Sequence, residues 1–178
     1  MPDPIRVLIA DDHEVVRQGL RLILEEEEFV VAGEASDGAD AVRLAGELKP
    51  EVVLMDLRMP GMGGLEAIAQ IRSEWPEIAI VILTTYDEDE LMLRGLRAGA
   101  RGFLLKDTRR QVLCDTLRAA ARGETLLLPE VMARVMNQPP EPPENVTSPS
   151  AKALSLTERE RQVLRGVAKG ERSKEIAK

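Results

Sequence analysis

The sequence has few aromatic residues, one cysteine and no long apolar run, and each shortage excludes a class of protein. Aromatic residues make up 2% of the chain against 44% hydrophobic residues, so a folded core must be mainly aliphatic. The single cysteine, Cys114, excludes an internal disulfide framework and argues against a cysteine-based zinc site, so we predict a core position for it. No apolar run approaches the roughly 20 residues of a membrane span, and no signal peptide is visible. We therefore predict a cytoplasmic protein without membrane contact.

Charged residues are abundant and unevenly distributed. They make up 31% of the 178 residues, and the net charge is −7. Acidic residues outnumber basic ones over residues 1–123, and the reverse holds over residues 151–178. This asymmetry suggests two functions, the second one near a polyanion.

The first 122 residues alternate between short β-branched segments and amphipathic helical segments. The predicted strands cover residues 5–10, 29–35, 51–55, 78–83 and 102–105. In the segments between these strands, apolar residues recur at helical spacing. This alternation predicts an α/β domain with a doubly wound parallel sheet, covered by helices on both faces.

We predict three parts in the chain. Residues 1–122 form the α/β domain. Residues 123–153 form a linker, with a short helix followed by a proline-rich stretch at 139–150. Residues 154–178 begin a second, all-helical unit, in which Thr157 and Glu160 have the spacing of a capping box.

Polar residues follow four of the predicted strands. They are Asp11 and Asp12 after the first strand, Asp56 after the third, Thr84 and Thr85 after the fourth, and Lys106 after the fifth. The carboxyl ends of parallel strands share one edge of a sheet, where such folds bind ligands. We therefore expect these side chains to converge.

Three carboxylates at one edge repel each other unless a cation lies between them. An all-oxygen ligand set favours Mg²⁺, which also bridges carboxylates to phosphoryl oxygens. A carboxylate can itself be the nucleophile and form an aspartyl-phosphate, and Asp56 is the best placed to do so. Taken singly, Asp11 and Asp12 could cap a helix, and His13 is more often the start of a helix than a catalytic group. The convergence of the set favours the functional interpretation.

Four segments together resemble the receiver domain of bacterial two-component response regulators, and most closely the NarL/FixJ group. They are "VLIADDHEVVRQGL", "VVLMDLRMPGMGGLEA", "VILTTYDEDE" and "AGARGFLLKD", and the resemblance covers residues 5 to about 122. It implies a flavodoxin-like (βα)5 fold with strand order 2-1-3-4-5. It also implies that a sensor histidine kinase phosphorylates Asp56.

The same resemblance implies a role for each residue around Asp56. Asp12, Asp56 and the Arg58 carbonyl would bind Mg²⁺ directly, and Asp11 would bind it through water. The phosphoryl-binding and switch residues would be Thr84, Lys106 and Phe103, and Phe103 would turn inward after phosphorylation. Arg58 and Tyr86 hold the two positions that tune dephosphorylation, and their bulk predicts a slow reaction.

Residues 154–178 resemble the opening of a LuxR-type helix-turn-helix domain. The recognition helix that would enter the major groove is absent, so no DNA-reading residue can be named, and we expect the chain to be a fragment of a longer regulator. DNA binding would then belong to the full-length protein, as a homodimer promoted by phosphorylation.

Two other functions compete with this interpretation. Hydrolases that form an aspartyl-phosphate need a second carboxylate two residues after the nucleophile, and Arg58 occupies that position. We therefore predict a protein that is not an enzyme beyond its own phosphoryl transfer and slow autodephosphorylation. The second alternative is a receiver that acts through protein contacts without DNA.

Overall fold

The computed structural model describes residues 3–85, 88–127, 129, 132–133 and 136. The chain divides into two units, Met1–Gln138 and Pro139–Lys178. The predicted proline-rich stretch and the predicted start of a helix-turn-helix domain lie outside the described residues, so both stay predictions.

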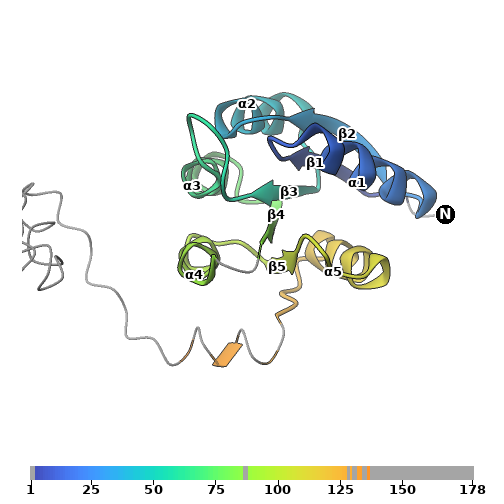
Figure 1. Ribbon diagram of the computed structural model, residues 1–178. Helices are drawn as coiled ribbons and strands as arrows, with labels where there is room; N and C mark the ends of the chain where they lie inside the picture. The colour runs from blue at the N-terminus through green and yellow to red at the C-terminus, as the bar shows by residue number, and fades with distance from the viewer. Residues whose placement is uncertain (1–2, 86–87, 128, 130–131, 134–135, 137–178) are drawn as a thin grey trace, which may run out of the picture. The chain divides into compact units, whose positions relative to one another are not determined.

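The first unit contains a five-stranded parallel sheet with the strand order β2-β1-β3-β4-β5 (Figure 1). The strands are β1 (Arg6–Ala10), β2 (Val30–Ala35), β3 (Val52–Asp56), β4 (Ala79–Thr84) and β5 (Gly102–Leu105). The connecting helices are α1 (Glu14–Glu26), α2 (Gly38–Leu48), α3 (Gly64–Glu74), α4 (Asp89–Arg97) and α5 (Arg110–Ala121). The predicted fold class and strand order are confirmed.

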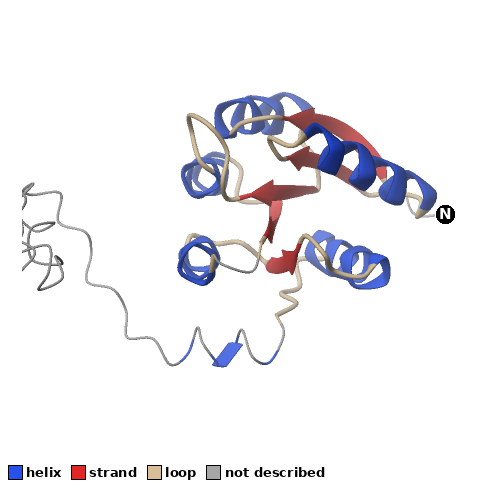
Figure 2. Ribbon diagram, in the orientation of Figure 1, coloured by secondary structure: helices blue, strands red, loops and turns tan. Residues whose placement is uncertain are grey.

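Helices cover both faces of the sheet (Figure 2). Helices α1 and α5 pack on one face, where Leu24 and Leu117 meet alternate strand residues such as Ile9 and Leu54. The remaining helices pack on the other face through residues such as Ile68. Successive strand residues point to opposite faces, so β3 and β4 are buried along their whole length, as their continuous apolar sequences require. Cys114 is fully buried against α1 and the sheet, as predicted.

The predicted strand boundaries are accurate to about one residue at the carboxyl edge of the sheet. The third strand extends one residue further than expected, so that Asp56 is its last residue and pairs in register with Leu83. The edge strand β5 makes one further parallel bridge, between Gly102 and Leu126. Among the described residues, no helix is long and apolar enough to cross a membrane.

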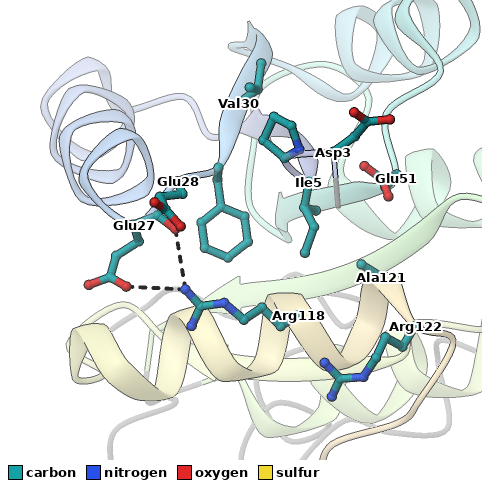
Figure 3. A pocket seen from close by; sticks show the side chains of 11 residues that line it. Asp3, Ile5, Glu27, Glu28, Val30, Glu51, Arg118, Ala121 and Arg122 are labelled. Carbon is teal, nitrogen blue, oxygen red and sulfur yellow. Dashed lines mark hydrogen bonds and ion pairs between the residues drawn. The ribbon is translucent and has the colours of Figure 1, made fainter. Parts of the chain in front are cut away.

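A hollow of about 750 Å³ lies at the opposite, amino-terminal edge of the sheet (Figure 3). Its apolar wall includes Ile5 and Phe29, and Arg118 lies over the Phe29 ring at 5.2 Å. The Arg118 guanidinium also contacts Glu27 Oε2 at 3.3 Å. These contacts tie α5 to the end of α1, so we interpret this hollow as structural.

Candidate functional site

The end of β3 places Asp56 at the centre of the carboxyl edge of the sheet. Its neighbours are β1, which leads into Asp11, and β4, which ends in Thr84. Asp56 and Asp11 are 3% and 1% exposed, so both carboxylates are withdrawn from bulk water. The predicted convergence of strand ends is therefore present at these positions.

Lys106 links the two buried carboxylates. It follows β5, and its backbone N–H donates to the Thr84 carbonyl at 2.8 Å, which fixes its position beside β4. Its Nζ lies 3.0 Å from Asp56 Oδ2 and 2.8 Å from Asp11 Oδ2. One ammonium group thus faces two carboxylates, which leaves an excess of negative charge.

The pKa values of Asp56 and Lys106 reflect this arrangement. Burial raises the pKa of Asp56 to about 6, and the negative charge of Asp11 contributes in the same direction. The hydrogen bond from Lys106 opposes the shift only in part. For Lys106, burial favours the neutral amine, but its contacts with Asp11 and Asp56 outweigh that effect and raise its pKa. At neutral pH the site therefore holds a charged lysine and a destabilised carboxylate.

The acidic residues fit a hard divalent cation. Ligand atoms of Asp11, Asp12, His13 and Asp56 all lie within 4.8 Å of one another. Asp11 Oδ2 is buried, and the Lys106 ammonium beside it is shared with Asp56 Oδ2. Buried carboxylates that share one cation are costly, and a metal ion would offset the remaining negative charge. Arg58 lies in the loop after β3, and its backbone N–H donates to Asp56 Oδ1 at 3.4 Å.

His13 closes one side of the acidic cluster. It is the N-cap residue of α1, which confirms the expected role at the start of a helix and places the cap one residue after Asp12. Its backbone N–H donates to Asp11 Oδ1 at 2.8 Å. Its Nδ1 also lies 3.1 Å from Asp11 Oδ1 and 3.0 Å from Asp12 Oδ1. The sequence did not predict these side-chain contacts, because they depend on how the loop turns after β1.

Thr84 and Arg58 meet at a residue that the sequence analysis missed. Thr84 is 1% exposed, and its hydroxyl donates to Glu88. The Arg58 guanidinium, on a side chain that is 69% exposed, forms an ion pair with the same carboxylate. Glu88 itself is buried. A glutamate directly before a helix resembles an ordinary N-terminal residue, so sequence alone gave no signal for its inward orientation.

Of the remaining predicted residues, the structure describes Phe103 and Thr85 but not Tyr86. Phe103 lies in β5, partly buried, and packs against the apolar clusters that contain Met55 and Met92. Its predicted inward turn stays a prediction. Tyr86 lies outside the described residues, so its tuning role also stays a prediction. Thr85 is exposed.

Two family models match the chain. The model described as "Response regulator receiver domain" matches residues 7–118, which include every site residue discussed above. The model described as "Bacterial regulatory proteins, luxR family" matches residues 154–178.

Individual proteins agree with these family matches. "Transcriptional regulatory protein YdfI" of Bacillus subtilis (strain 168) is 48% identical over 173 residues, which are 97% of this chain and 79% of YdfI. The receiver domain of the putative response regulator NarL from Mycobacterium tuberculosis is 36% identical, with a TM-score of 0.65, covering 69% of this chain and all of that one. The receiver domain of RcsB from Salmonella enterica serovar Typhimurium, solved in the presence of the phosphomimetic BeF3−, is 30% identical, with a TM-score of 0.65, over 74% of this chain and 98% of that one.

The sheet order, the acidic edge and the sequence matches agree with one another. The curated relatives are transcriptional regulators and not classical enzymes. The chain therefore belongs to the LuxR family of two-component response regulators, with a receiver domain and a LuxR-type DNA-binding domain.

Proposed function

We propose that Asp56 accepts a phosphoryl group from a sensor histidine kinase in a reaction that requires Mg²⁺. The observation that carries this proposal is the position of Asp56, a buried strand-end carboxylate that shares the Lys106 ammonium with the buried Asp11 carboxylate. No structural need of the sheet accounts for two carboxylates and a lysine in this place, because buried charge is costly unless it is used or paired.

The chain's own residues supply most of the required chemistry. An Asp56 oxygen attacks phosphorus, the new O–P bond forms as the bond to the kinase histidine breaks, and the leaving imidazole keeps or takes up a proton. Lys106 Nζ, already 3.0 Å from Asp56, balances negative charge on the transferring group. Asp11, Asp12 and Asp56, with the Arg58 carbonyl, would hold Mg²⁺, which neutralises charge between the carboxylates and the phosphoryl oxygens.

The output we propose is control of transcription through the LuxR-type segment. Phosphorylation would draw the Thr84 hydroxyl toward the phosphoryl group, and Phe103 would follow it inward. That movement would alter the surface of α4, β5 and α5 and promote a homodimer able to bind DNA. The match of residues 154–178 to a DNA-binding family supports this output over a receiver that acts through protein contacts alone.

Phosphorylation can be tested with acetyl phosphate, which replaces the kinase. We expect the intact mass of the wild-type protein to increase by one phosphoryl group in the presence of Mg²⁺. Asp56→Ala should gain none, and a chelator should abolish the gain in the wild type. Asp115→Asn, at an exposed aspartate of α5 away from the site, is the matched control and should be phosphorylated like the wild type. An adduct that persists in Asp56→Ala, or that forms without metal, would overturn the proposal.

A further inference from the structure

Glu88 is a buried carboxylate to which the proposed phosphoryl transfer gives no role. It is 6% exposed. It is also the N-cap residue of α4, but its side chain makes no capping hydrogen bond. A carboxylate at this position would ordinarily accept from the free N–H groups of the first helical turn and gain from the helix dipole. Its inward orientation therefore needs a cause.

The cause is a pair of partners in the site. One Glu88 oxygen accepts the Thr84 hydroxyl, and the other pairs with the Arg58 guanidinium. The two contacts account for the burial of the charge. They also join three parts of the chain, since Arg58 follows β3, Thr84 ends β4 and Glu88 precedes α4.

The contact with Thr84 competes with phosphoryl binding. A threonine hydroxyl has a single proton to donate. While that proton is donated to Glu88, it is not available to a phosphoryl oxygen on Asp56. A site that reaches its competent arrangement only part of the time binds its ligand more weakly in proportion. Once the Thr84 hydroxyl turns away, the Glu88 side chain is free to cap the first turn of α4.

We propose that Glu88 is a positioning residue that holds the Thr84 hydroxyl and the Arg58 guanidinium in the unphosphorylated protein and thereby weakens phosphoryl binding at Asp56. This inference rests on the proposed function, because it concerns the same phosphoryl site. It gives the receiver a latch whose release couples the site directly to the first turn of α4.

The latch can be tested with beryllofluoride and Mg²⁺ as the probe, titrated into the full chain by calorimetry. Glu88→Ala removes both contacts and should bind the probe roughly tenfold more tightly, in line with the net strength of a hydrogen bond to a charged group. Glu88→Gln keeps an acceptor for Thr84 but loses the charge, and neutral hydrogen bonds are about half as strong. We expect about a threefold gain for Glu88→Gln.

Two controls separate the latch from a general effect of charge. Glu90→Gln removes the same charge from an exposed position on α4 and should change the affinity less than about twofold. In a Thr84→Val background, which has no hydroxyl to hold, Glu88→Ala should change the affinity no more than Glu90→Gln does in the wild type. Circular dichroism melts of each variant establish that the receiver domain is folded.

The outcomes distinguish this inference from the proposed function. A graded gain from Glu88→Gln to Glu88→Ala that disappears in the Thr84→Val background supports the latch. If the wild type binds the probe but Glu88 variants bind it equally well, or if the gain survives in the Thr84→Val background, the latch is wrong and the proposed function stands. If the wild type neither binds the probe nor accepts phosphate, both are wrong.

Discussion

We expect Gly64→Ala to lower the free energy of unfolding of the receiver domain by about 3 kcal/mol, the upper part of the usual range for added atoms in a packed region. Gly64 is the first residue of α3, and its N–H donates to the Leu57 carbonyl at 3.0 Å. A Cβ at this position would overlap the Asp56 carbonyl oxygen and lie 2.7 Å from the Leu57 Cα. Because the obstacles are backbone atoms, no side-chain rotation can relieve them.

Gly64→Ala should also disturb the functional site. The overlap can be relieved only by moving the end of β3 or the start of α3, and Asp56 is the last residue of that strand. Phosphorylation by acetyl phosphate should therefore be slower in Gly64→Ala even where the protein is folded. Even a 1 Å displacement of a reacting group can reduce a rate about a hundredfold.

Gly19→Ala is the matched control for this prediction. Gly19 lies within α1, and apart from the adjacent helix backbone an added Cβ would meet nothing within 4 Å. Alanine in a helix interior is favoured over glycine, so this variant should be about 0.5–1 kcal/mol more stable than the wild type. Urea unfolding of the three proteins measures both effects. A loss below about 1 kcal/mol in Gly64→Ala would show that the loop after β3 adjusts easily.

The fold was predictable because its central strands β3 and β4 are buried on both faces. A segment such as residues 78–83 must be apolar throughout in a central parallel strand, so its sequence stands out from the amphipathic helices on either side. The boundaries were less certain, because the hydrogen bonds that end a strand leave little trace in residue type. Asp56 illustrates this, since it was expected after the strand and is its last residue.

The site was predictable only where the topology determines proximity. Asp11, Asp56 and Lys106 follow parallel strands, so the sheet itself brings them together. Glu88 and His13 reach the site through the local course of loops, which is set by side-chain contacts and not by periodicity. The prediction that His13 lies at the start of a helix was confirmed, and the sequence analysis made no prediction for Glu88.

Asp56→Asn should stabilise the metal-free protein at pH 8 by about 3 kcal/mol relative to the wild type. The pKa of Asp56 is raised from 3.8 to about 6 by burial and by the charge of Asp11. The folded protein therefore holds a proton on Asp56 more tightly than the unfolded chain does. As the pH rises from about 4 to about 6, the wild type loses stability that the asparagine variant keeps, and above pH 6 the full difference is present.

The measurement is the free energy of unfolding in urea from pH 4 to pH 8 with chelator present. The difference between Asp56→Asn and the wild type should be small near pH 4 and reach its full size by pH 7. Asp115→Asn, a substitution at an exposed aspartate of α5, should remain within about 0.5 kcal/mol of the wild type. A difference between Asp56→Asn and the wild type that is constant with pH would point to packing of the amide and not to the charge of Asp56.

Magnesium should narrow this difference in stability, because the charge that lowers the stability of the wild type is also the charge that binds the cation. In the wild type, a Mg²⁺ concentration ten times the dissociation constant would add about 1.4 kcal/mol. Asp56→Asn keeps Asp11 and Lys106 but loses a carboxylate, so it should gain less from the same addition. The buried charge of Asp56 would then lower the stability of the metal-free protein and at the same time favour metal and phosphoryl binding. Equal gains in both proteins would place the cation away from Asp56.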